Sequence, residues 1–126
     1  MLLLRFIGLG EIITFLRKSI EKAIATGIEK EYLVIDPGIG FGKTPEDNYR
    51  IINNLAELKA LGLPIMIGTS RKAFIAKVTG GEPQERMEGT AATIVASIMN
   101  GCHIIRVHDV ACMKNIAAVT DAILHT

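Results

Sequence analysis

Three clusters of polar and glycine residues in this chain carry side chains that can bind a ligand. They are "DPGIGFGKT" at residues 36–44, "GTSRK" at residues 68–72 and "RVHDV" at residues 106–110. Each cluster follows, or extends from, a short apolar run that is typical of a buried strand. Because ligands bind at the carboxyl ends of strands in α/β folds, we expect the three clusters to share one pocket.

The glycine-rich cluster looks like a phosphate-binding loop, but its spacing does not fit one. A Walker loop, G-x-x-x-x-G-K-S/T, aligned on residues 42–44 would require a glycine at position 37. That position is Pro37, which has no N–H group to donate to a phosphate. The dinucleotide-binding pattern G-x-G-x-x-G also fails, because the loop glycines are spaced two apart. We therefore expect a different use for an acidic residue followed by a flexible turn.

Asp36 and Phe41 are the residues of this loop that could contact a flat ligand. The Asp36 carboxylate could accept two N–H bonds from a planar heterocycle with an amino group, or it could bond its own turn. The Phe41 ring could cover such a ligand, or it could fill the core. Their positions alone leave both alternatives open for each residue.

The second cluster has the composition of an anion site. Ser70, Arg71 and Lys72 begin a predicted helix directly after a predicted strand. Free N–H groups and the helix dipole favour an anion at such a place, and the three polar side chains add to that preference. The alternative is a capped helix whose charges are simply solvated.

The third cluster places two basic residues on one face of a predicted strand. Arg106 and His108 are two residues apart, so their side chains point the same way. In a closed barrel that face is interior, where an arginine needs a partner. The partner is expected to be a pyrophosphate or a carboxylate such as that of Asp109. Ligand spacing for a metal is not evident, because no two histidines or carboxylates are suitably placed.

Apolar periodicity predicts the elements that position these clusters. Apolar residues at steps of four predict a helix over residues 11–26. The predicted strands are residues 32–35, 64–68 and 103–110. The later helices are predicted at residues 69–78, 89–101 and 112–124. Thr44 and Pro45 are the residue types of a helix cap and a first helical position, so a further helix is expected to begin here and to end near Gly62.

The order of these elements is one helix followed by three strand–helix units. The clusters recur at intervals of about 35 residues, close to the roughly 31 residues per unit of a (β/α)8 barrel. The predicted fold class is therefore α/β, a partial (β/α)8 TIM barrel made of three βα units and a preceding helix. A compact open sheet of three or four strands is the alternative.

Composition limits the classes of function. The 126 residues suffice for one small domain with a core, and 49% of them are hydrophobic. The net charge of +1 gives no reason to expect nucleic-acid binding. No apolar run reaches the roughly 20 residues that span a bilayer, the start lacks the features of a signal peptide, and the two cysteines form no C-x-x-C motif. We expect a cytoplasmic protein.

Together, the three clusters resemble the last three strand-end motifs of the dihydropteroate synthase family, in order and at similar intervals. The resemblance covers residues 11–126 and implies the C-terminal half of a pterin-binding TIM barrel, with its last three βα units. Residues 1–10 do not resemble the family and form an unassigned apolar segment. The family is a transferase of folate biosynthesis that joins p-aminobenzoate to 6-hydroxymethyl-7,8-dihydropterin pyrophosphate and releases pyrophosphate.

The resemblance implies one substrate site. Its expected residues are Asp36, Phe41, Gly68, Ser70, Arg71, Lys72, Arg106 and His108. Asp36 is expected to bind the edge of the pterin ring and Lys72 its polar atoms, while Arg106 and His108 are expected to hold the pyrophosphate. The expected catalytic residues are Lys72, Arg106 and His108.

The p-aminobenzoate site is implied to lie beside the pterin site. Phe41 and Arg71 are expected to border it, with Ser70 near the carboxylate. The aniline nitrogen is a competent nucleophile, so the reaction needs no strong general base. The positive charge that develops at the pterin methylene needs a leaving group whose charge is met by arginine, histidine and metal.

The resemblance also implies Mg²⁺ as a cofactor, but its binding loop belongs to an N-terminal half that this chain lacks. We therefore expect this chain alone to be inactive or weakly active. The alternatives are an inert, truncated pterin- or pyrophosphate-binding module and a pterin-binding methyltransferase domain. Because a partial barrel exposes strand edges and apolar faces, we expect either a homodimer through the late helices or association with the missing half.

Overall fold

The computed structural model describes residues 8–126, so most of the apolar segment at residues 1–10 lies outside the described part. The α-helices are α1 (Leu9–Ala25), α2 (Pro45–Asn53), α3 (Ala73–Thr79), α4 (Met87–Met99) and α5 (Val110–Leu124). The strands are β1 (Met66–Ile67) and β2 (Ile104–Ile105), and short 3-10 helices are η1 (Lys30–Tyr32), η2 (Leu55–Leu61) and η3 (Pro83–Glu85). The order of helices and extended segments is that of a partial α/β unit.

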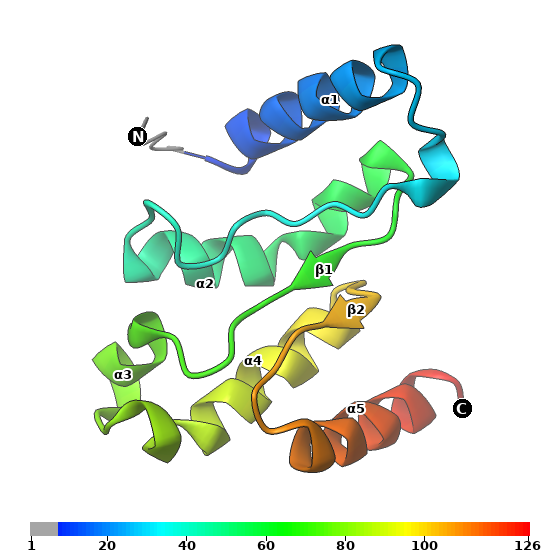
Figure 1. The fold of residues 1–126 in the computed structure, drawn as a ribbon. Coiled ribbons are helices and arrows are strands. Elements are labelled where there is room, and N and C mark those ends of the chain that lie inside the picture. Colours follow the sequence, from blue (N-terminus) through cyan, green and yellow to red (C-terminus); the bar gives the residue numbers. More distant parts are fainter. Residues whose placement is uncertain (1–7) are drawn as a thin grey trace.

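Three extended segments form the centre of the fold (Figure 1). Strand β1 pairs with β2 in parallel, with Met66 opposite Ile104. On the other side of β1, Ile35 forms an isolated parallel bridge with Ile65. Because all three segments run the same way, their carboxyl ends meet at one edge, and the three polar clusters begin there.

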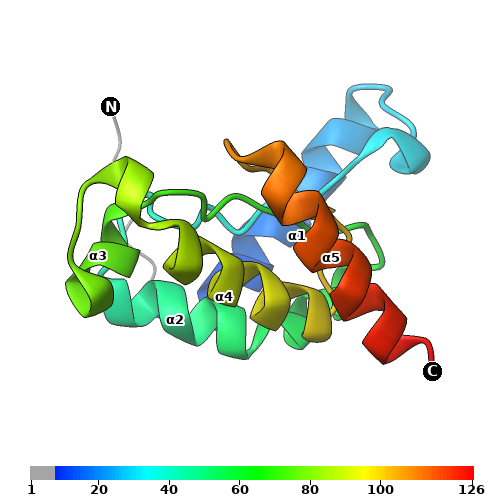
Figure 2. The same ribbon diagram turned by 90° about the horizontal axis from the view of Figure 1, so that it is seen from below.

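Helices α2 and α4 lie next to each other, with α3 and α5 at either side of the pair (Figure 2). Helix α4 contacts α2, α3 and α5, while α1 contacts η2. The buried apolar side chains of the main core are Ile12, Leu16, Ile35, Ile39, Ile51, Ile52, Leu55, Leu58, Leu61, Leu63, Ile65, Ile67, Phe74 and Ile75. This core joins α1, α2, η2, α3 and the extended segments, so it fixes the edge that carries the clusters.

The start of α2 confirms the predicted cap. The Thr44 hydroxyl accepts a hydrogen bond from the N–H of Asp47, and the Asp47 carboxylate accepts one from the N–H of Thr44, both at 3.2 Å. The predicted end of this helix is wrong, because α2 stops at Asn53 and η2 carries the chain on to Gly62. The Asn54 amide donates to the carbonyl of Arg50, and such local bonds compete with regular helix.

The predicted strands are longer than the observed ones. Only Ile35 of the predicted strand 32–35 joins a bridge, and only β2 forms within the predicted strand 103–110. Parallel strands need hydrogen-bonded neighbours, and within residues 8–126 the outer edges of this small sheet have none. None of the helices in the described residues is long and apolar enough to cross a membrane.

Candidate functional site

The loop at residues 36–44 is held by bonds within itself and to α2. Asp36 Oδ1 accepts a hydrogen bond from the N–H of Gly38, and Asn48 Oδ1 accepts one from the N–H of Gly40, each at 2.8 Å. The Lys43 ammonium donates to the carbonyls of Gly38 and Phe41 at 2.8 and 3.0 Å. The N–H groups of Gly38 and Gly40 thus already donate hydrogen bonds to side chains, and the loop carbonyls accept hydrogen bonds from Lys43. This arrangement does not resemble a phosphate cradle.

Lys72 reaches from the end of the β1 segment across to this loop. Its Nζ donates to the carbonyl of Ile39 at 2.5 Å and lies 4.8 Å from the centre of the Phe41 ring. A Cβ at Gly40 would lie 3.0 Å from Lys72 Cδ, and Gly40 has a φ of 85°. The loop therefore needs glycine at this position both for its backbone and for the passage of Lys72.

Charges from all three clusters act on Lys72. Burial lowers the pKa of its ammonium below the ordinary value, the nearby guanidinium of Arg106 lowers the pKa further, and the Asp36 carboxylate opposes both effects. The Lys43 ammonium adds a smaller lowering of the pKa. The structure thus brings Asp36, Lys72 and Arg106 to one edge of the sheet, as the order of the clusters predicts.

Arg106 lies across the backbone of the neighbouring strand end. Its Nη2 would be 3.0 Å from a Cβ placed on Gly68, so a side chain at Gly68 would displace the guanidinium. Arg106 and His108 are both exposed in this small open sheet, whereas the interior position was expected only for a closed barrel. Strand β2 ends at Ile105, so the predicted strand does not extend to Arg106 and His108, although exposure still alternates along residues 104–109.

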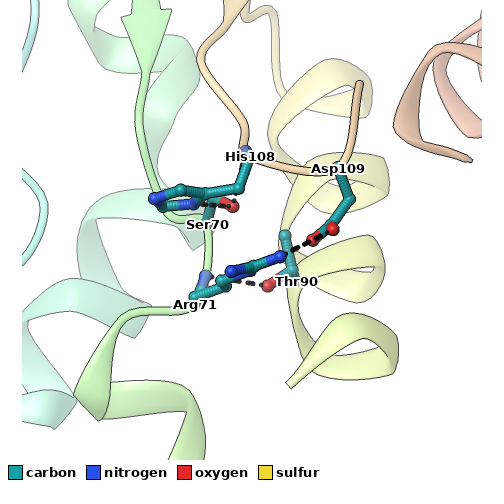
Figure 3. Close-up of polar contacts among 5 residues, drawn as sticks. All are labelled: Ser70, Arg71, Thr90, His108 and Asp109. Carbon is teal, nitrogen blue, oxygen red and sulfur yellow. Dashed lines mark hydrogen bonds and ion pairs between the residues drawn. The ribbon is translucent and has the colours of Figure 1, made fainter. Parts of the chain in front are cut away.

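The carboxylate expected as a partner of Arg106 pairs with another arginine. Asp109 accepts two hydrogen bonds from Arg71, at 2.8 and 3.3 Å (Figure 3). This pair lowers the pKa of the Asp109 carboxyl and raises that of the Arg71 guanidinium, in both cases mainly through the hydrogen bonds. Among the described residues, Arg106 forms no ion pair, so its charge is available to an anion.

Ser70 and His108 form a second link between the same two segments. Ser70 Oγ lies 2.7 Å from His108 Nδ1, and it accepts the backbone N–H of His108 at 3.0 Å. Figure 3 shows this link beside the Arg71–Asp109 pair. The predicted role of Ser70 near a substrate carboxylate stays a prediction, but its hydroxyl already has partners within the protein.

A pocket of about 330 Å³ opens between the glycine loop and α3. It combines two aromatic rings with three ammonium groups. Its lining is Gly40, Phe41, Lys43, Pro45, Asn48, Lys72, Ala73, Phe74 and Lys77. Phe41 is 66% exposed, so its ring is available to a ligand rather than used as core filling. Such a pocket is suited to an aromatic molecule with a negative group.

Of the residues expected to bind pterin and pyrophosphate, Lys72 lines this pocket, whereas Asp36, Arg106 and His108 are not part of its lining. The second oxygen of Asp36, Oδ2, has no hydrogen-bond partner among the described residues. Within residues 8–126, no group of three or more histidine, cysteine or acidic side chains lies close enough together to hold a metal ion.

Several residues that shape the site escaped the sequence interpretation. Lys77 reaches the pocket from the exposed side of α3, and Thr90 on α4 accepts the N–H of Arg71 at 3.1 Å. Of these three residues, only Asn48 could have been identified from the sequence, because it is a polar residue on the apolar face of α2. The structure shows that it is buried. A buried amide requires hydrogen-bond partners and therefore marks a structural contact.

Comparison with known proteins gives a consistent set of relatives. The family described as pterin binding enzyme matches residues 9–108. Dihydropteroate synthase of Bacillus subtilis (strain 168) is 41% identical over 117 residues, which cover 93% of this chain and 41% of that protein. This chain spans about two fifths of the length of such relatives.

Solved structures that resemble this chain carry the same name as its sequence relatives. The crystal structure of dihydropteroate synthase from Clostridium difficile in the presence of pteroic acid has a TM-score of 0.89 and 50% identity, over 90% of this chain and 43% of that one. Dihydropteroate synthase of Xanthomonas albilineans with 4-aminobenzoic acid has a TM-score of 0.89 and 38% identity, over 93% of this chain and 43% of that one.

Proposed function

Because this chain belongs to the pterin binding enzyme family, we propose that it forms the C-terminal part of a dihydropteroate synthase with a TIM-barrel fold, acting in the cytoplasm. The proposed reaction joins p-aminobenzoate to 6-hydroxymethyl-7,8-dihydropterin pyrophosphate. The lone pair of the aniline nitrogen forms a bond with the pterin methylene carbon. The bond from that carbon to the pyrophosphate oxygen breaks, its electron pair leaves with the oxygen, and the nitrogen releases a proton.

The observation that carries the proposal is the position of Lys72. Its ammonium contacts the Phe41 ring and the loop carbonyl of Ile39. The charges of Asp36 and Arg106 both shift its pKa, in opposite directions. A molecule with a polar heterocycle and a pyrophosphate can therefore contact all three clusters from one edge. Asp36 Oδ2 is available to accept N–H groups of a pterin ring, and Lys72 can donate to the ring's acceptor atoms.

The pocket beside Phe41 fits the second substrate. A relative binds 4-aminobenzoic acid, which has an aromatic ring and one carboxylate. The ring can stack on Phe41, while Lys43 and Lys77 supply positive charge for the carboxylate and Lys72 is left to the pterin. In the proposal, this pocket holds p-aminobenzoate with its amine directed toward the pterin methylene.

Arg106 and His108 are proposed to hold the departing pyrophosphate. The Arg106 guanidinium forms no ion pair with a described residue, and both side chains are exposed on the edge that carries the clusters. Donors aimed at the leaving oxygen stabilise the charge that develops there. The described residues do not fit a Mg²⁺ site, since Asp36 lies among the cations of Lys43, Lys72 and Arg106, so no step here depends on the metal.

Binding by calorimetry tests these assignments. Arg106→Ala should weaken pyrophosphate binding by about 1.5–3 kcal/mol, as for a charged hydrogen bond. Lys72→Ala should weaken binding of 6-hydroxymethylpterin instead. If Lys72→Ala reduced only pyrophosphate affinity, the two subsites would be interchanged, and unchanged affinity in Arg106→Ala would remove Arg106 from the site. If bound 6-hydroxymethylpterin were displaced by methyl-folate but not by pyrophosphate, the result would favour a methyltransferase domain.

Because the chain spans about two fifths of its relatives, we propose that residues 1–126 alone bind ligands with little turnover. Supplying both substrates with Mg²⁺ and measuring dihydropteroate tests this point, and robust turnover would contradict it.

We further propose that the chain associates, either with a second copy or with a complementary N-terminal half. Helix α5 exposes the apolar side chains of Val119 and Ile123, which association could cover. Sedimentation at micromolar concentration tests this proposal, and a monodisperse monomer would contradict it.

A further inference from the structure

The Ser70 hydroxyl is a buried connection between two strand ends. Ser70 follows β1, His108 follows β2, and Ser70 is only 6% exposed. Its Oγ accepts the backbone N–H of His108 at 3.0 Å and lies 2.7 Å from Nδ1 of the same residue (Figure 3). The hydroxyl therefore contacts both the backbone and the ring of one histidine.

Counting protons assigns the direction of the second bond. A serine hydroxyl has one proton to donate and two lone pairs to accept. The N–H of His108 occupies one lone pair, and within residues 8–126 the only acceptor in contact with the hydroxyl is Nδ1 of His108. Because buried donors are paired, the Ser70 proton is directed at Nδ1. That nitrogen must then carry a lone pair, and the proton of the neutral ring must lie on Nε2.

The neighbouring residues keep the two strand ends at this distance. Arg71 has a φ of 58°, a left-handed conformation that is uncommon for a residue other than glycine. Its N–H donates to the buried hydroxyl of Thr90, its carbonyl accepts from Arg86 at 2.8 Å, and its guanidinium binds Asp109. Arg71 is thus fixed by α4 on one side and by the start of α5 on the other.

From these contacts we infer that Ser70 is a positioning residue that selects the Nε2–H tautomer of His108. The Nε2 atom points away from Ser70 in Figure 3, and no described residue bonds it. A neutral His108 then presents an N–H donor to an anion, whereas the other tautomer would present a lone pair that repels it. The identity of that anion as pyrophosphate rests on the proposed function, but the tautomer does not.

The ligand-free wild-type chain tests the tautomer directly. Long-range ¹H–¹⁵N spectra of histidine-labelled protein, recorded in mildly alkaline buffer where imidazole is neutral, report which ring nitrogen carries the proton. The His108→Gln variant assigns the signal. His125 is an internal reference, because its Nδ1 faces the carbonyl of Asp121 at 2.7 Å and so should carry a proton. A proton on Nδ1 of His108 in the wild type would overturn the inference.

Variants at Ser70 test the consequence. Ser70→Ala should give His108 a mixture of both tautomers and a several-fold loss of pyrophosphate affinity, and Ser70→Thr, which keeps the hydroxyl, should restore both. An unchanged tautomer in a folded Ser70→Ala protein would overturn the inference, and if this variant does not fold, the wild-type spectrum decides. If wild-type His108 carries its proton on Nε2 but the chain does not bind pyrophosphate, the proposed function is contradicted and the tautomer assignment is still supported.

Discussion

The ammonium group of Lys72 lies 4.8 Å from the centre of the Phe41 ring, and this contact joins the cluster after β1 to the glycine loop. This contact connects segments that are far apart along the sequence. It also places a cation and an aromatic ring in the lining of the same pocket.

Replacing the ring in Phe41→Leu should lower the pKa of Lys72 further, because the ring face stabilises the ammonium form. A cation–π contact at an accessible site contributes about 0.5–1 kcal/mol. The ¹³Cε chemical shift of Lys72, followed against pH, measures the change, and Phe41→Tyr is the control that keeps the ring. A Lys72 titration that is the same in wild type and Phe41→Leu would show that the contact has no energetic effect.

Gly68→Ala should reduce pyrophosphate affinity several-fold without unfolding the chain. The new Cβ would lie 3.0 Å from Nη2 of Arg106, so the flexible guanidinium must move. Because Arg106 supplies the nearest atoms, stability should change by only about 0.5 kcal/mol. Calorimetry and urea unfolding measure the two effects. Gly10→Ala is the control, since nothing lies within 4 Å of its Cβ, and equal affinity in both variants would argue against this position of Arg106.

Asn48→Ala should destabilise the glycine loop. It removes the acceptor of the Gly40 N–H, a bond of 2.8 Å made by a side chain that is 2% exposed. Leaving that donor unpaired costs about 1–3 kcal/mol in the free energy of unfolding. Urea unfolding measures the loss, and Asn53→Ala, at the exposed end of the same helix, should cost much less. Similar losses in the two variants would mean that the Asn48 bond does not hold the loop.

The Arg71–Asp109 pair should make stability depend on pH in acid. The hydrogen bond from Arg71 holds the pKa of the Asp109 carboxyl below its ordinary value of 3.8. A carboxyl whose pKa is lower in the folded state stabilises that state above the unfolded pKa, and this contribution is lost as pH falls through the two values. Asp109→Asn should therefore lose less stability than wild type as pH falls below 3.8.

Urea unfolding at a series of pH values measures the Asp109 effect. Asp121→Asn is a suitable control, because Asp121 is an exposed carboxylate of α5 that forms no ion pair with a described residue. It should follow the wild-type profile. Parallel profiles for wild type and Asp109→Asn would show that the pair is not linked to folding.

The sequence by itself determined the features that depend on local spacing. The Thr44 cap, the helical periodicity of α1 and the position of each polar cluster after an apolar run are encoded within a few neighbouring residues. Since parallel strands bring their carboxyl ends to one edge, the order of the clusters was enough to predict that Asp36, Lys72 and Arg106 lie at the same edge. Strand lengths could not be predicted, because they depend on neighbouring strands.

Only the tertiary structure decided which polar groups are partners. Asp109 stands three residues from Arg106, yet it binds Arg71, and Ser70 binds His108. Each of these bonds crosses 38 positions of the chain, and the register of β1 against β2 sets which side chains meet. A shift of one residue in that register would turn the side chains to the other face. The composition of each cluster is local, but the pairing between clusters is a property of the packed sheet.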